Sequence, residues 1–214
     1  LITADGRFPN YVLLTSRSAL KEKYGANTAT VIIEAMQDLA LKITSLPNWN
    51  ALVLVPDDAD LMAELGLPAV TNADAWTLKS ALVSLDKKLA SRGEMIGALL
   101  IIGGHEIVPF HLLPNPTDDS DVNVPSDNPY ATLDENYFVQ QWPVGRIPDE
   151  TGNEAVFLIE QLRYLNNEYA VKVEAKNMRS SSIISSLLAA ITELIRSRLR
   201  VIQREFHLGC SAEV

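Results

Sequence analysis

Three short, almost uninterrupted apolar runs restrict the fold of this chain more than any other feature. They are Tyr11–Thr15 (YVLLT), Ala51–Val55 (ALVLV) and Ala98–Ile102 (ALLII). Apolar runs of this length without alternation are typical of strands that are buried on both faces. A sheet covered on both faces requires helices between its strands, so we expect a helix after each run.

Helical periodicity fills the intervals between these runs. Apolar residues recur at three- and four-residue spacing or fill short helical stretches over four segments: 28–46, 59–65, 73–91 and 151–169. Asn72 is the predicted N-cap of the third segment, and Thr151 with Glu154 forms a predicted capping box for the fourth. A further short strand is predicted over Val144–Ile147. The pattern predicts an α/β three-layer sandwich, with a mainly parallel sheet and helices on both faces.

The chain divides into two predicted regions. Residues 1–169 form the α/β subdomain, and 170–214 form a linker and the start of a following, truncated subdomain. The linker is the polar stretch 170–179, and an amphipathic helix is predicted over 182–200. Both ends of the sequence resemble cut ends, so we expect an excised piece of a longer protein. Self-association is expected if the apolar face of the last helix is exposed; its residues are Ile184, Leu187, Leu188, Ile191 and Ile195.

Composition excludes several classes of partner. The 214 residues carry a net charge of −9, and no basic stripe is present, so neither nucleic acid nor an anionic membrane surface is an expected partner. Cys210 is the single cysteine, which excludes an internal disulfide and a cysteine-based zinc cluster. No signal peptide and no apolar stretch of the roughly 18 residues that a membrane helix needs is found. The compartment, cytoplasmic or exported, stays open.

The carboxyl ends of the predicted strands are where an open α/β sheet binds ligands. Asp57 and Asp58 follow the second strand, and Glu106 follows the third. These carboxylates could hold a divalent cation in a metal-dependent hydrolase. Alternatively, Asp57 and Asp58 cap the short helix that follows them. His105 points away from Glu106 in an extended chain, so we expect a structural role for it in the loop.

A long aperiodic segment, 105–141, is rich in Pro, Asp and Asn, and long loops of this kind are usually functional or disordered. Its acidic side chains could ligate calcium or could simply be solvated; they are Asp118, Asp119, Asp121, Asp127, Asp134 and Glu135. His207 and Cys210 form the only close His–Cys pair, but a three-residue step does not suit a catalytic dyad. No phosphate-binding loop, nucleophile elbow or zinc-protease signature is present, so no catalytic residue is predicted.

Four segments in a fixed order resemble the gingipain-type cysteine peptidases, family C25 of the caspase-like clan. They are Leu99–Gly104 (LLIIGG), Ile107–Phe110 (IVPF), Ser126–Tyr130 (SDNPY) and Val144–Pro148 (VGRIP). A fifth segment, Gly209–Val214 (GCSAEV), is similar to a later stretch of that family, with Cys210 in place of an aromatic residue. The resemblance covers the N-terminal subdomain region of such enzymes, over about 97–165.

The resemblance implies a caspase-like sheet and catalytic His and Cys residues in a second α/β subdomain beyond Val214. It also implies a structural calcium site at Asp127, Asp134 and Glu135, with no other cofactor required; the family's glycine-rich loop is shortened here. The implied function is that of a supporting subdomain of a cysteine endopeptidase, which packs on the catalytic subdomain and shapes the cleft for a polypeptide substrate. The alternative is a stand-alone, non-catalytic binding or scaffold module that uses its acidic, calcium-binding loop.

Overall fold

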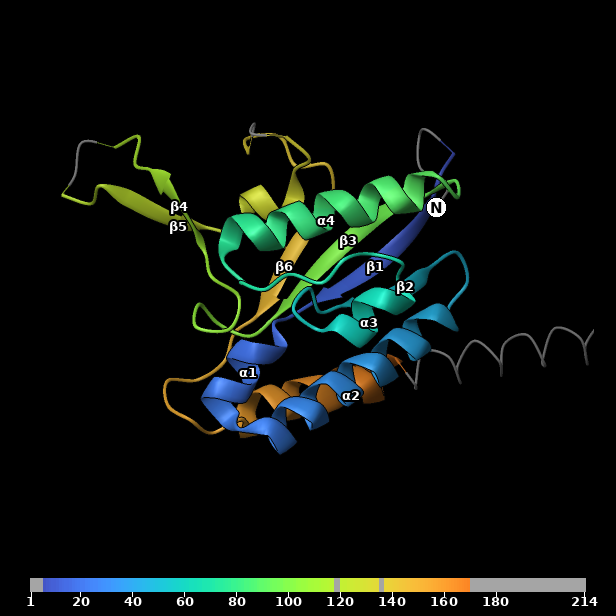
Figure 1. The fold of residues 1–214 in the computed structure, drawn as a ribbon, viewed down its shortest axis with the longest axis horizontal. Helices are drawn as coiled ribbons and strands as arrows, with labels where there is room; N and C mark the ends of the chain where they lie inside the picture. The colour runs from blue at the N-terminus through green and yellow to red at the C-terminus, as the bar shows by residue number, and fades with distance from the viewer. Residues whose placement is uncertain (1–5, 118–119, 135–136, 170–214) are drawn as a thin grey trace, which may run out of the picture. The chain divides into compact units, whose positions relative to one another are not determined.

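Four parallel strands form the central sheet of the computed structural model, which describes residues 6–117, 120–134 and 137–169. They are β1 (Phe8–Leu14), β2 (Asn50–Leu54), β3 (Glu94–Ile102) and β6 (Val144–Ile147). Their order is β2-β1-β3-β6, and every neighbouring pair is parallel (Figure 1). The predicted parallel sheet is therefore confirmed.

Helices cover both faces of this sheet. The helices are α1 (Arg17–Tyr24), α2 (Ala26–Thr44), α3 (Ala59–Glu64), α4 (Ala75–Ala90) and a last helix over 156–169. In Figure 1, α1, α2 and the helix over 156–169 lie on one face, and α4 lies on the other. The amide of Asn166 donates to the carbonyl of Ala35 at 3.1 Å, which ties the last helix to α2. The three-layer α/β sandwich predicted from the sequence is confirmed.

The apolar runs of β1 and β3 are mostly buried and that of β2 is buried only at Leu54 and Val55, and the strands β1 and β3 extend beyond their runs. Val12, Leu13 and Leu14 point alternately to the two faces of the sheet, and all are completely buried. β1 nevertheless begins at Phe8, before the apolar run. Its polar residue Asn10 stays in the ladder because its side chain donates to the Glu94 carboxylate at 2.8 Å.

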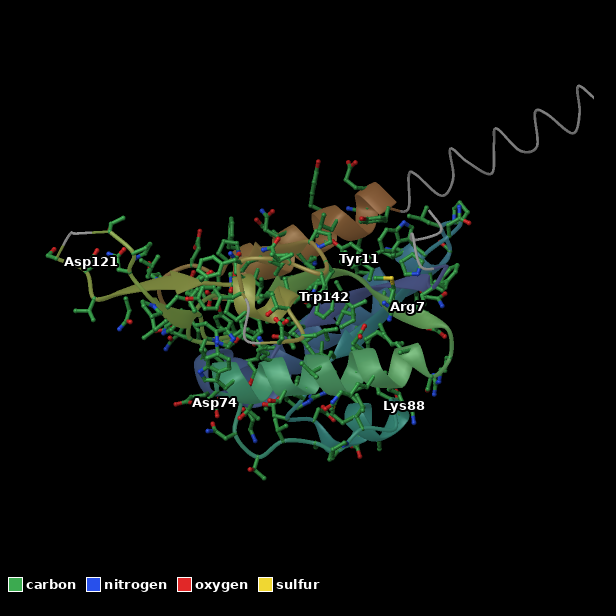
Figure 2. The ribbon with its side chains drawn as sticks, turned by 90° about the horizontal axis from the view of Figure 1, so that it is seen from above. Arg7, Tyr11, Asp74, Lys88, Asp121 and Trp142 are labelled. Carbon is green, nitrogen blue, oxygen red and sulfur yellow. The ribbon has the colours of Figure 1, made fainter. Side chains whose placement is uncertain are left out.

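Helix starts differ from the prediction at three places. α1 was not predicted, because Leu20 is its only buried residue and leaves no apolar stripe. Asp74, not Asn72, caps α4: its carboxylate accepts from the amides of Trp76 and Thr77 at 3.0 Å, and Asn72 donates to Asp74. Figure 2 shows Asp74 at the start of α4 and Lys88 near its other end, as the helix dipole favours.

The predicted capping box of Thr151 and Glu154 is also wrong. The last helix begins at residue 156, and 151–153 form bends before it. Both side chains are exposed and lie outside the helix, so neither can serve as its N-cap or N3 residue.

The segment predicted to be an aperiodic loop contains local structure. β4 (His111–Pro114) and β5 (Asn123–Ser126) pair as an antiparallel hairpin, which projects beyond the sheet in Figure 1. A 3-10 turn, η1 (Asn128–Ala131), follows it. The turn is buried at Pro129, Tyr130 and Ala131, so the chain returns from the exposed hairpin into the core before β6.

The second predicted region, 170–214, lies outside the described residues, as do its linker, its amphipathic helix and Cys210. Among the residues that are described, no helix combines the length and the apolar character needed to cross a membrane.

Candidate functional site

The side chain of Arg146 in β6 joins three other segments that are far apart in the sequence. Its Nε and Nη2 atoms donate to the two carboxylate oxygens of Asp127 at 2.9 and 2.5 Å. Its Nη1 atom donates to the carbonyls of Gly103 at 2.7 Å and Val108 at 2.9 Å. The Arg146 side chain is only 9% exposed. A bidentate arginine–carboxylate pair of this kind fixes the orientation of both side chains and also stabilises the fold. We call the residues Gly103, Val108, Asp127 and Arg146 the Arg146 hub.

Aromatic residues surround the hub. The Phe110 ring lies 4.3 Å from the guanidinium carbon of Arg146, in a cation–π arrangement. Tyr130 is completely buried, and its hydroxyl donates to the carbonyl of Pro109 at 2.6 Å. The indole of Trp142 donates to the carbonyl of Tyr130 at 3.2 Å. Burial raises the pKa of Tyr130, so this phenol remains a neutral donor.

Gly103 allows the strand β3 to turn sharply into the hub. Its φ of +112° lies in a region that side chains rarely adopt. A Cβ atom at this position would also lie 2.7 Å from the side chain of Ile107. Glycine is therefore required here on both grounds, and the turn directs the Gly103 carbonyl toward Arg146.

A second polar network lies beside the carboxyl ends of β3 and β6 and includes α1. The Lys23 ammonium pairs with Glu106 at 2.6 Å and with Asp149 at 2.7 Å. Tyr24 donates its hydroxyl to the same Asp149 oxygen at 2.8 Å. Burial alone would raise the pKa of Asp149, but the hydrogen bonds from Lys23 and Tyr24 hold it below the usual range. Because Lys23 and Tyr24 of α1 both donate to Oδ2 of Asp149, this network links α1 to the chain just after β6.

Asp57 caps α1 rather than the helix that follows it. Its carboxylate accepts from Ser16 Oγ at 2.9 Å, from the Arg17 amide at 2.9 Å, and from the Ser18 amide and hydroxyl at 2.7 and 2.5 Å. Burial would raise the pKa of Asp57, but these bonds, led by those from Ser18, lower it. The positive end of the α1 dipole is therefore already occupied by an internal anion.

The carboxylates proposed for a metal-dependent hydrolase have other partners. Asp58 caps α3 as predicted, accepting from the amides of Asp60 and Leu61 at 3.1 Å, and it also pairs with Arg17. Glu106 pairs with Lys23. Within the described ranges, no three His, Cys, Asp or Glu side chains are grouped so that they could hold a metal ion.

The predicted calcium ligands occupy different environments. Both carboxylate oxygens of Asp127 accept from Arg146, so this residue works as the anion of the hub. Asp134 offers its main-chain carbonyl to the Lys79 ammonium, which also donates to Thr132 Oγ1 at 2.9 Å. Glu135 lies outside the described residues. Calcium binding at these three residues stays a prediction.

His105 has the structural role in the loop that was expected. Its Nδ1 atom accepts from the Phe110 amide at 3.0 Å, and the two rings stack with centroids 5.7 Å apart. The imidazole therefore closes the turn after β3 by accepting from a backbone N–H group.

His111 was not singled out in the sequence. It is 2% exposed, and neither ring nitrogen has a hydrogen-bond partner among the residues that the structure describes. The ring lies edge-on to Trp76 at 4.6 Å and to Tyr130 at 4.5 Å between centroids. Burial, together with the nearby Lys79 charge, lowers the pKa of His111 to about 4. No sequence signal marks it, because its environment is built from three separate segments.

No family model, no curated protein and no solved structure matches this chain. The resemblance to the gingipain-type peptidases stays a prediction, and the geometry described above is the physical basis for any functional proposal.

Proposed function

We propose that this α/β unit is the non-catalytic, supporting subdomain of a gingipain-like cysteine endopeptidase. In this role it packs on a catalytic subdomain and shapes one wall of the cleft that receives a polypeptide substrate. In the intact enzyme a thiolate attacks the peptide carbonyl, with help from a histidine and an oxyanion site that lie outside residues 1–214.

The observation that supports this proposal is the Arg146 hub. The four segments that carry the family resemblance each contribute one residue to it: Gly103, Val108, Asp127 and Arg146. Arg146 and Asp127 meet through their side chains, whereas Gly103 and Val108 contribute main-chain carbonyls, so the hub joins the four segments through two side chains and two backbone groups. A chance resemblance is less expected for four segments that meet at one buried network than for four segments scattered over the surface.

The polar groups at the strand ends also favour a supporting role. Asp57, Asp149 and Lys23 make internal bonds that cap α1 or link it to the chain after β6. A catalytic acid, base or nucleophile needs access to substrate and a pKa suited to proton transfer. The lowered pKa values of Asp57 and Asp149 instead keep these groups ionised as anchors.

The activity of the chain itself tests the proposal. Residues 1–214 should hydrolyse no casein and no fluorogenic peptide, and Cys210→Ala should change nothing. The same assay on the full product of the gene that encodes this chain should detect hydrolysis that an alkylating reagent abolishes. Peptidase activity in residues 1–214 that Cys210→Ala removes would overturn the proposal.

The gene distinguishes the proposal from the stand-alone binding module. A downstream histidine and a strand-end cysteine in the encoded protein support the peptidase. A stop codon near Val214, or an unrelated following domain, supports the module instead.

A further inference from the structure

The strand β2 is an outer strand of the sheet. β1 pairs with one side of it, and no strand pairs with its other side in the part of the chain that the structure describes. Four of the five residues of β2 are only partly buried, in contrast to the completely buried C-terminal half of β1, Val12–Leu14. An open edge of this kind is a template for pairing with another extended segment.

The ladder shows which backbone groups face outward. The Thr15 amide donates to the Leu54 carbonyl at 3.2 Å, so Leu54 faces β1. Backbone groups alternate along a strand, and Ala51 and Val53 therefore face away from β1. Thr44 Oγ1 accepts from the Ala51 amide at 3.0 Å. The amide and carbonyl of Val53 and the carbonyl of Ala51 are left directed at the open edge.

A groove of about 660 Å³ runs along this edge between α2 and α3. Aliphatic side chains line it, including Leu41 from α2 and Leu61 and Leu65 from α3. Leu41 lies in the last turn of α2 and is 70% exposed, so its apolar side chain is open to solvent at the groove. The groove thus offers apolar contact next to backbone donors and acceptors that no described strand pairs with, the combination used when a peptide adds a strand to a sheet.

The charge around the groove is of one sign. Glu34 and Asp38 line it from α2, and Glu64 lines it from α3, whereas no lysine or arginine is among its lining residues. A segment that alternates basic and aliphatic residues complements both the acidic rim and the apolar wall. A second copy of this chain does not, because edge-to-edge pairing would bring two acidic grooves together.

We propose that the β2 edge binds an extended segment of a partner polypeptide in which Lys or Arg alternates with aliphatic residues. The segment adds a strand beside β2 through Val53, and its basic side chains pair with Glu34, Asp38 and Glu64. The site lies on the outer strand opposite β6, the strand that carries the Arg146 hub, and it does not depend on the proposed peptidase role.

The test uses residues 1–214 and an acetylated octapeptide that alternates lysine and valine. Nuclear magnetic resonance titration should show saturable shifts at Ala51, Leu52 and Val53, with slowed hydrogen exchange at the Val53 amide. The Glu34→Gln, Asp38→Asn, Glu64→Gln triple variant should bind the peptide about tenfold more weakly, since each rim pair contributes only a fraction of a kcal/mol. An octapeptide N-methylated on its central backbone amides should not bind, because it cannot pair with the strand edge.

A matched control removes the same number of charges elsewhere. Glu22→Gln, Glu150→Gln, Glu154→Gln alters three exposed carboxylates that do not line the groove, and it should bind like the wild type. If both triple variants bound the peptide equally weakly, binding would depend only on the net charge of the protein, and the proposal would be overturned. Shifts that map away from β2, or the absence of saturation, would also overturn it. A concentration-dependent dimer that the groove variant abolishes would identify a second copy as the occupant instead.

Discussion

Arg146 makes two kinds of contact that a lysine cannot combine. Its planar fork pairs with both oxygens of Asp127 while a third nitrogen serves the carbonyls of Gly103 and Val108. A lysine keeps the charge but has one nitrogen, so Arg146→Lys should leave part of the hub unpaired. We expect a loss of about 2–3 kcal/mol in the free energy of unfolding, measured by urea denaturation.

Arg163→Lys is the matched control, since Arg163 is exposed on the last helix. Its effect should stay within about 0.5 kcal/mol, as for ordinary surface changes. Equal stability of the two variants would show that the hub does not hold these segments together.

The buried imidazole of His111 gives a pH-dependent prediction. Its pKa of about 4 in the folded protein lies below the ordinary value of 6.5. Between these values the unfolded chain binds a proton that the folded chain does not, so the free energy of unfolding falls as the pH decreases from 6.5 toward 4. The loss from this group can reach about 3 kcal/mol.

Replacing His111 with phenylalanine should remove that contribution. Phenylalanine preserves the edge-on contacts with Trp76 and Tyr130 and has no nitrogen to protonate. Urea titrations between pH 4 and 7 should show a smaller loss of stability on acidification for His111→Phe than for the wild type. If the unfolding free energy depended on pH identically in the two proteins, the prediction would be wrong, and protonated His111 would have to gain a partner in the folded protein.

At the level of elements, the contact between the β3 turn and the end of β6 permits almost no side chain at Gly104. A Cβ atom there would overlap the Asp149 carboxylate, which is held by Lys23 and Tyr24. Gly104→Ala should therefore displace Asp149, free α1 from β6, and cost about 2–3 kcal/mol in thermal or urea unfolding.

Gly145 supplies the comparison for this substitution. A Cβ atom at Gly145 would meet only the Leu100 side chain at 3.9 Å, which is an ordinary contact. Gly145→Ala should be neutral or slightly stabilising, because alanine reduces the freedom of the unfolded chain. Comparable losses for the two variants would contradict the role given to the Asp149 network.

The sequence predicts elements well where a single periodicity decides them. The runs at 11–15, 51–55 and 98–102 become β1, β2 and β3, because a buried parallel sheet requires continuous apolar strands. The β4–β5 hairpin was missed, since Pro114 and Pro125 interrupt strands that carry no alternation. Leu112 and Val124 of the hairpin are exposed, so the two strands have no apolar face from which they could be predicted.

Polar contacts between residues far apart in the sequence limited how much of the candidate site could be predicted. Asp127 looks like a calcium ligand in a sequence of acidic residues, and only the fold reveals that Arg146, 19 residues later, takes both of its oxygens. From its position in the sequence, Asp57 was likewise predicted to cap the helix that follows it. In the structure it accepts from the first amides of α1, which lies before it in the chain. Pairings between separate elements depend on topology, which local spacing does not encode.

At the scale of the whole described unit, the sheet formed by the described residues ends in two outer strands, β2 and β6, with different surroundings. The β6 side carries the Arg146 hub and the segments that resemble a peptidase subdomain. The β2 side carries an acidic, partly apolar groove. We therefore propose support and recognition as the two roles of this unit, with bond-breaking chemistry in another part of the intact protein.

The location of the reactive cysteine tests that account most directly. The full product of the gene should be treated with peptidyl acyloxymethyl ketones, which alkylate only an activated catalytic thiolate, and the labelled residue should be identified by mass spectrometry. The account predicts one labelled cysteine outside residues 1–214, with Cys210 unmodified. A label on Cys210, or no label in a protein that carries this α/β unit, would contradict it.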